Sequence, residues 1–261
     1  MNEVSSDKHG ISRNVLKIIA IVTITIGHFF LYTFSTTRCF GVGKPWVGFM
    51  MMVCFIGPPI FMFFISEGFI HTSSRKRYGT RLLIFALITQ IAFSITTTGG
   101  WGFSFKTFFF NWNVFFALFL GFIDLCIIES RQKPAVKVIG ILATLLLSYF
   151  TNTEWWVFGQ LIIITHYMLR KHNVIRFIVA FLFFYLTFVF ANCNFGSGFY
   201  PVIINTGMLY ELFYGAIGTA LVCFFYHGKN GKKSKILQYF FYVFYPLHLI
   251  LIDIVNYLGG N

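Results

Sequence analysis

Nine apolar stretches alternate with short polar segments along the whole chain. They cover residues 16–34, 48–69, 80–95, 107–128, 136–151, 155–169, 174–191, 205–226 and 236–257. A transmembrane helix needs about 20 predominantly apolar residues to cross roughly 30 Å of hydrocarbon. Most of these stretches approach that length. The pattern therefore predicts an all-α polytopic integral membrane protein with about nine transmembrane helices.

The fifth and sixth stretches are short, and only Asn152, Thr153 and Glu154 separate them. They can form a tight hairpin or one re-entrant pair, and the sequence leaves both open. The first stretch is too long and too aromatic for a cleavable signal peptide, and no small-x-small cleavage pattern follows it.

Composition agrees with a protein that lies almost wholly in the membrane. Of its 261 residues, 57% are hydrophobic and only 11% are charged, whereas soluble domains carry about 25% charged residues. The longest polar stretch is residues 1–10. We therefore expect a single transmembrane domain over residues 1–261 and no soluble domain.

Lysine and arginine residues predict the orientation, because they concentrate in cytoplasmic segments of membrane proteins. With the N-terminus placed inside, seventeen of them fall in cytoplasmic segments and three in outer segments. The bias alternates correctly at every loop. It predicts a cytoplasmic N-terminus, an outer C-terminus and an odd number of spans.

The net charge of +12 then follows from this bias and from attraction to anionic lipid headgroups. We expect membrane lipids as partners and no nucleic acid. The five cysteines are dispersed, and their spacing does not suggest a metal site. Cys39 and Cys193 both fall on the predicted outer side and could pair, although small apolar filler is the simpler interpretation. The sequence has no Walker loop, GxGxxG or HExxH motif, and we expect no metal.

Ionisable side chains inside a bilayer are costly, which makes the few present candidates for function. His28 follows Lys17 by eleven residues, a helical rise of about 16 Å, and so lies near mid-membrane. His248 lies twelve residues into the ninth span, at about 18 Å by the same rise. Two histidines at similar depth could share a site, where an imidazole can move protons near neutral pH. Packing alone would also explain a single buried histidine.

Glu67 ends the second span, where it could form an ion pair with Arg75 or Arg81 or orient an imidazole. The basic residues of the next loop could hold cofactor phosphates through charge-assisted hydrogen bonds, or they could only set the topology. These residues are Arg75, Lys76, Arg77 and Arg81.

Asn111, Trp112 and Asn113 open the fourth span from the predicted outer side. They could bind a polar acceptor, or they could form an aromatic belt with helix capping. Pro58 and Pro59 should break the second span, because proline frees a backbone carbonyl. Pro246 should kink the ninth span beside Tyr245 and His248.

Several segments together resemble the TraX family of membrane acetyltransferases. The opening LKIIAIVTITIGHFF, the block FFISEGFIHTSSRKRYGTRLLIFALITQIAFSI, the segment NVFFALFLGF and the terminal FYVFYPLHLILI follow the order and spacing of that family. The likeness spans nearly the whole chain. The first helix also resembles the acyltransferase-3 group, in which a basic residue, ten intervening residues and a catalytic histidine recur.

The resemblance implies an acetyltransferase of the bacterial inner membrane that uses acetyl-CoA as donor. It implies that His28 is the catalytic base and that Lys17 is a cation that binds the cofactor or organises the site. Glu67, Tyr245 and His248 match the acidic residue and the terminal motif of the family. The acceptor would be an amine or hydroxyl of an exported peptide, such as a pilin N-terminus, or of a cell-surface glycan.

One position departs from the family pattern, which usually has Asp directly before the first-helix histidine, where this chain has Gly27. Glu67 is our expected substitute for that acid, and Gly27 is expected to leave room for substrate beside His28. Two alternatives remain. One is a transporter or flippase, since proline-broken helices with intramembrane His and Glu are common there. The other is an inactive relative that acts as an assembly partner.

Overall fold

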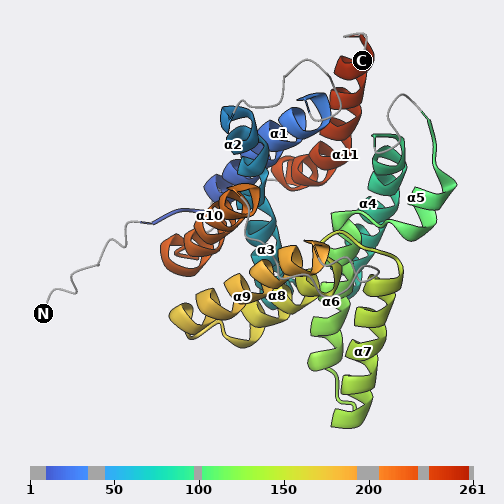
Figure 1. Cartoon of the computed structure of the whole chain (residues 1–261). Coiled ribbons are helices and arrows are strands. Elements are labelled where there is room, and N and C mark those ends of the chain that lie inside the picture. Colours follow the sequence, from blue (N-terminus) through green and yellow to red (C-terminus); the bar gives the residue numbers. More distant parts are fainter. Residues whose placement is uncertain (1–9, 35–44, 97–101, 193–205, 229–234, 259–261) are drawn as a thin grey trace, which may run out of the picture.

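The computed structural model describes residues 10–34, 45–96, 102–192, 206–228 and 235–258, which form a bundle of helices (Figure 1). These residues contain no strand, only an isolated bridge between Ile11 and Tyr226. The α-helices are α1 (Arg13–Phe34), α2 (Pro45–Met52), α3 (Gly57–His71), α4 (Arg75–Thr96), α5 (Phe105–Phe110), α6 (Val114–Ile128), α7 (Pro134–Phe150), α8 (Trp156–Met168), α9 (Asn173–Asn192), α10 (Thr206–Ala220) and α11 (Lys235–Leu258).

Six helical segments of the described chain are long and apolar enough to cross a membrane. They are Arg13–Leu31, Val47–His71, Arg75–Thr96, Phe105–Ile128, Asn173–Phe190 and Tyr239–Leu258. Three further apolar helices are shorter, at Pro134–Phe150, Trp156–Met168 and Leu209–Phe225. Each predicted stretch is therefore helical, while the number of crossings and the side on which each terminus lies stay predictions. The chain is a polytopic helical membrane protein.

Two long spans are interrupted: the second just before the prolines that predicted a break, and the fourth at a break that the sequence did not predict. In the second, a 3-10 turn η1 (Val53–Ile56) precedes α3, whose first turn contains Pro58 and Pro59. Prolines are tolerated there because first-turn N–H groups have no partner within the helix. In the fourth, α5 ends at Phe110 and α6 begins at Val114, where the Asn113 side chain accepts a hydrogen bond from Phe115 N–H.

The short fifth and sixth spans form a tight hairpin of α7 and α8, which pack against each other. The turn between them holds Asn152, Trp155 and Trp156 in the left-handed backbone region, with φ of 44°, 67° and 46°. The two helices thus form a hairpin, and whether each crosses the membrane or the pair is re-entrant stays a prediction.

Helix α3 lies centrally, since it packs against α1, α6, α8 and α10. Helix α11 packs against α1 and α4, which brings the last span of the chain beside the first. Aromatic side chains fill much of the interior, often edge to face, as between Phe69 and Phe122 with ring centroids 5.6 Å apart.

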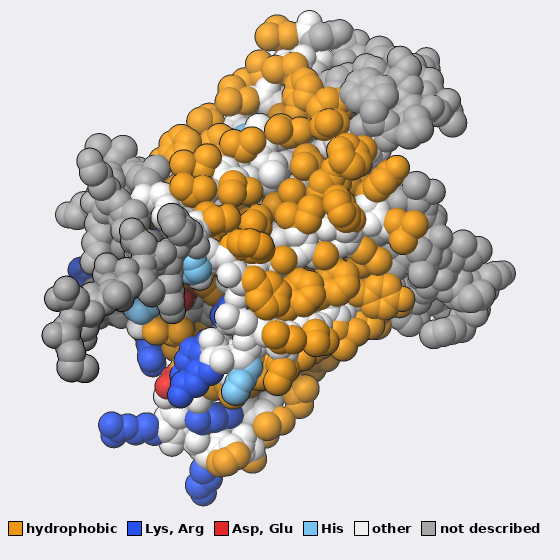
Figure 2. Space-filling view, turned by 90° about the vertical axis from the view of Figure 1, so that its left-hand side faces the viewer, with side chains coloured by type: hydrophobic (Ala, Val, Ile, Leu, Met, Phe, Trp, Pro, Cys, Tyr) orange, Lys and Arg blue, Asp and Glu red, His pale blue; other side chains and the backbone are white. Residues whose placement is uncertain are grey.

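The surface matches a membrane environment. Figure 2 shows hydrophobic side chains across the middle of one face, with Lys and Arg side chains gathered at one end. Helix α7 is exposed along most of its length, and its Ile139 and Phe150 are 66% and 70% exposed. Such a helix has lost little of its apolar surface to packing, and lipid can cover the rest.

Candidate functional site: a cavity with two histidines

A cavity of about 780 Å³ lies among α1, α3, α4, α6, α9, α11 and the turn before α8. Helix α1 supplies a wall in which cavity-facing residues recur every three or four positions, so that one helical face lines it. These residues are Asn14, Lys17, Ile21, Ile24, His28 and Leu31. The cavity therefore joins the basic end of α1 to the middle of the span.

His28 of α1 and His248 of α11 contact each other at this cavity. His28 Nδ1 lies 2.9 Å from His248 Nε2, and the two rings stack at 16° with centroids 5.2 Å apart. His248 is only 3% exposed. The similar depth of the two histidines, predicted from the sequence, is thus accompanied by direct contact.

The second nitrogen of His248 fixes the direction of this hydrogen bond. His248 Nδ1 lies 3.2 Å from the carbonyl oxygen of Phe244. A carbonyl can only accept, so we assign the proton of a neutral His248 to Nδ1. His248 Nε2 must then accept from His28 Nδ1–H, and the remaining nitrogen of His28, Nε2, is an acceptor. The arrangement makes His248 an orienting group for His28.

Tyr245 contacts both imidazoles. Its ring centroid is 5.0 Å from that of His248 and 6.2 Å from that of His28, both edge to face. Tyr245 is buried and lines the cavity. Pro246 follows within α11, where it cannot donate a backbone hydrogen bond.

The other end of the cavity is basic. Arg13 and Lys17 of α1 and Arg81 of α4 all line it. Lys17 Nζ lies 5.4 Å from the ring centroid of Phe64 and 4.9 Å from that of Phe241. The Nε atoms of Arg13 and Arg81 are buried, and neither has a hydrogen-bond partner within the described part of the chain.

The other basic residues predicted to bind a cofactor do not line this cavity. Arg75, Lys76 and Arg77 are exposed on the first turn of α4, and the Arg75 guanidinium stacks 4.3 Å from the Phe69 ring centroid. Of the predicted basic loop, the structure therefore brings only Arg81 into the cavity, together with Lys17.

Glu67 lies away from the histidines. Its Oε1 accepts a hydrogen bond from Tyr226 Oη at 3.0 Å and lies 3.6 Å from Arg13 Nη2 and 3.4 Å from His71 Nε2. Arg13 is fifteen residues from His28 on α1, about 22 Å along a helix. Glu67 is therefore a partner of the basic end rather than the acid that orients His28.

Gly27 does not open space beside His28, contrary to our expectation. A Cβ built there would lie 2.4 Å from Cys54 Cβ and 2.8 Å from the Met51 carbonyl oxygen. The glycine instead allows α1 to pack closely against α2 and η1. An aspartate at this position would not fit the observed packing.

Asn111, Trp112 and Asn113 also do not line the cavity. Asn113 is fully buried, and its Nδ2 donates to the Ala86 carbonyl and to Gln90 Oε1. Asn111 Oδ1 accepts from Asn152 Nδ2 at 2.7 Å, and Trp112 stacks on Phe116. Of the two roles that the sequence left open, the structure shows helix capping, because Asn113 caps the start of α6. Asn111 joins this segment to the α7–α8 turn through its hydrogen bond with Asn152.

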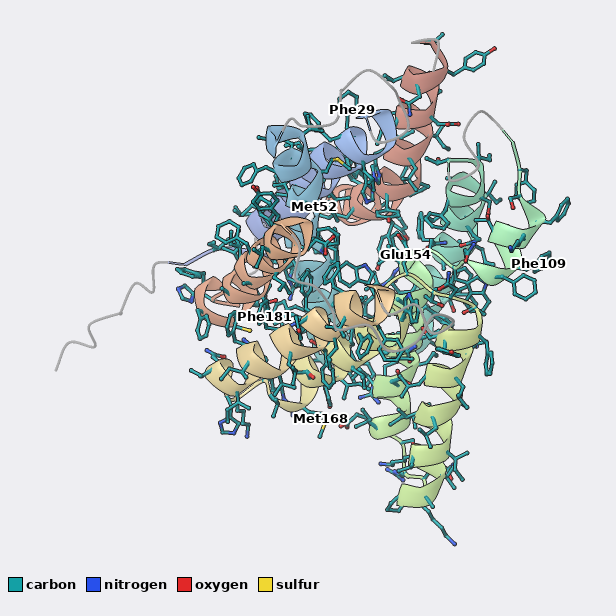
Figure 3. The ribbon with its side chains drawn as sticks, viewed as in Figure 1. Phe29, Met52, Phe109, Glu154, Met168 and Phe181 are labelled. Atoms are coloured by element: carbon teal, nitrogen blue, oxygen red, sulfur yellow. The ribbon has the colours of Figure 1, made fainter. Side chains whose placement is uncertain are left out.

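Glu154 lines the cavity, although we did not predict it as a site residue. It belongs to the α7–α8 turn, and its Oε2 accepts the Val114 N–H at 2.6 Å. Burial raises the pKa of this carboxyl to about 7. Figure 3 shows Glu154 toward the middle of the molecule, whereas Phe109 of α5 lies at its edge. A lone acid between two apolar stretches was the signal that could have identified it.

The described residues hold no group of three His, Cys, Asp or Glu that could bind a metal ion. Cys54, Cys126 and Cys223 are free thiols, and Cys39 and Cys193 lie outside the described residues.

Fold and site together define a polytopic helical membrane protein with a cavity lined by His28, which contacts His248 behind it. Residues 12–256 match the family described as TraX protein, so the chain belongs to the TraX family. It is also similar to the probable fimbrial assembly protein FimC, serogroup H1, of Dichelobacter nodosus. The two are 27% identical over 259 residues, which cover 92% of this chain and 96% of the relative. No solved structure matches the chain.

Proposed function

We propose that this protein is a membrane acyltransferase that moves an acetyl group from acetyl-CoA to an amine or hydroxyl of an exported, pilin-related acceptor. The observation that carries the proposal is the hydrogen bond between His28 and His248 in a cavity whose far end is basic. The family and the fimbrial assembly relative support a pilin-related acceptor.

The basic end fits the phosphates of CoA. Arg13, Lys17 and Arg81 supply three cations, and guanidinium groups bind phosphate through charge-assisted hydrogen bonds. The unpaired Nε donors of Arg13 and Arg81 are available for such bonds. By the positive-inside bias this end faces the cytoplasm, where acetyl-CoA is found, and the apolar middle of the cavity suits the thioester arm.

In the reaction, the acceptor nitrogen or oxygen attacks the thioester carbonyl while His28 Nε2 takes its proton. The new C–N or C–O bond forms, the C–S bond breaks, and the proton passes to the departing CoA thiolate. His248 holds His28 in the tautomer whose Nε2 accepts. General base catalysis of this kind contributes roughly 10²- to 10⁴-fold. The same atom could instead carry the acetyl group transiently, which would split the transfer into two steps.

The test uses purified protein in nanodiscs with radiolabelled acetyl-CoA and follows CoA release and label transfer to a pilin peptide. Wild-type protein should release CoA faster than His28→Ala, while both bind CoA equally. His166→Ala is the matched control, because His166 is another buried histidine and does not line the cavity. Equal CoA release by wild type and His28→Ala would refute the proposal.

A flux measurement separates enzyme from transporter. The same protein reconstituted in liposomes should move label across the membrane only as acetylated product. Movement of unmodified acceptor without CoA release would instead establish the transporter alternative.

A further inference from the structure

The α7–α8 turn concentrates backbone strain in the wall of the cavity. Asn152, Trp155 and Trp156 are the non-glycine residues with positive φ among those the structure describes. Such conformations cost free energy for residues with a side chain, and they cluster where a protein holds a ligand. All three flank Glu154, and Glu154, Trp155 and Trp156 line the cavity.

Hydrogen bonds hold this turn in place. Glu154 N–H donates to the Trp112 carbonyl at 2.7 Å, and Trp112 N–H donates to the Thr151 carbonyl at 3.2 Å. Ser148 Oγ donates to the Trp156 carbonyl at 3.0 Å. The backbone that carries Glu154 is therefore tied to both α6 and α7, which keeps its carboxylate at one place in the cavity wall.

One carboxylate oxygen is left for a ligand. Oε2 accepts the Val114 N–H, and no hydrogen bond within the described residues occupies Oε1. The neighbouring wall is aromatic, because Trp155 and Trp156 adjoin it and Trp155 packs against Phe188 with ring centroids 6.1 Å apart. The cavity-lining Lys and Arg side chains come from the first two turns of α1 and α4 instead.

A carboxylate in an aromatic wall suits a cation. An ammonium group can pair with the carboxylate and interact with tryptophan faces, and such cation–π contacts strengthen as water is excluded. A neutral hydroxyl acceptor would gain neither contribution. A phosphate or carboxylate ligand would be repelled here and attracted to Lys17 and Arg81.

We infer that the α7–α8 turn is the acceptor-recognition site and that Glu154 binds a primary ammonium group of the acceptor. This inference rests on the proposed acyl transfer, and it selects the amine from the two acceptor classes. The bound ammonium loses one proton to Glu154 and from there to water. The resulting amine attacks the thioester, His28 takes the second proton, and the CoA thiolate receives it as the amide forms.

The test measures binding without catalysis. Wild-type protein in nanodiscs, without acetyl-CoA, is titrated with a short peptide amide that has a free N-terminus and no lysine. The same peptide with an N-terminal hydroxyl in place of the amine is the comparison ligand. We expect wild type to prefer the amine at least tenfold and Glu154→Gln to lose that preference. Glutamine can still accept the Val114 N–H, so the turn should keep its structure.

Control variants isolate the carboxylate and separate this inference from the acyl transfer. Glu129→Gln removes a carboxylate outside the cavity, which accepts from Tyr167 Oη, and should keep the preference. His28→Ala should also keep it while losing acyl transfer. Phosphatidylethanolamine, compared with phosphatidylcholine in the nanodisc, distinguishes a lipid ammonium from a peptide ammonium as the bound group.

Two results would overturn the inference. One is a wild-type protein that binds amine and hydroxyl peptides equally while it still acylates the hydroxyl peptide, which leaves the proposed enzyme standing. The other is a Glu154→Gln variant that melts like wild type and keeps the full preference for the amine.

Discussion

The two ends of the cavity differ in the sign of their charge and in how that charge is held. At one end Arg13, Lys17 and Arg81 extend from the first two turns of α1 and α4. At the other, a single carboxylate, Glu154, is carried by a strained turn whose backbone is hydrogen-bonded on both sides. A group of three cations suits a large polyanion, whereas a single carboxylate on a hydrogen-bonded turn suits one small cationic group. His28, which contacts His248, lines the same cavity.

The largest expected effect comes from separating the two histidines. His28→Ala should lower the rate of acetyl transfer by roughly 10²-fold or more, because it removes the base. His248→Ala should cause a smaller loss, since it removes only the group that orients His28. Stopped-flow measurement of CoA release at saturating acetyl-CoA checks this order. Equal losses in both variants would mean that His248 takes part in the chemistry itself.

The wall beside the histidines offers the next test. Gly27→Ala places a methyl group against Cys54 and the Met51 carbonyl, and overpacking of this kind costs about 1–3 kcal/mol. We expect a lower melting temperature in detergent than for Gly48→Ala, where an added Cβ meets no atom within 4 Å. A Gly27→Ala protein that melts like Gly48→Ala would show that α1 and η1 can separate, and that substrate could enter there.

At the basic end, position rather than charge should decide the effect. Arg81→Ala should raise the KM for acetyl-CoA about tenfold, because a hydrogen bond to a charged group is worth about 1.5–3 kcal/mol. Lys76→Ala removes the same charge from an exposed site on the same helix and should change KM less than twofold. Steady-state kinetics at low salt compares the two. Similar KM values for both variants would mean that the basic end attracts acetyl-CoA only through its overall positive charge and not through a direct hydrogen bond from Arg81.

Much of this architecture was readable in the sequence, because bilayer thickness limits helix length and charge. Residues 16–34 and 236–257 were predicted as spans, and Lys17 and His28 share a helical face because eleven residues make about three turns. Glu67 and Gly27 were misjudged for another reason. The partners of Glu67 come from α1 and from the end of η2 (Leu221–Phe225), and the neighbours of Gly27 come from α2 and η1. Those contacts depend on tertiary packing.

Glu154 was not predicted as a site residue for the same reason, because the cavity wall to which it belongs is built from segments distant in the chain. Asn111, Trp112 and Asn113 lie at the break between α5 and α6 inside the fourth span rather than at its start. Spacing alone could not show that Asn111 and Trp112 bond to the α7–α8 turn. In the sequence, a single acid in a three-residue connection looks like part of a solvent-exposed turn. Only the folded structure shows that the start of α6 lies beside it and donates a hydrogen bond to its carboxylate.

The smallest expected effect is the pH dependence that Glu154 gives to stability. Burial raises its pKa in the folded protein from the ordinary 4.5 to about 7. Between these values the folded state binds more protons than the unfolded state, so stability should fall as pH rises from about 4.5 to 7. Glu154→Gln removes the titrating group and should flatten this part of the curve.

Melting temperatures from pH 4 to 8 measure the difference between this variant and wild type. The expected shift is a few degrees. If the curves of wild type and Glu154→Gln stayed parallel throughout, the carboxylate would be well solvated. The proposed contrast between a buried carboxylate on a fixed turn and the cations at the other end of the cavity would then be lost.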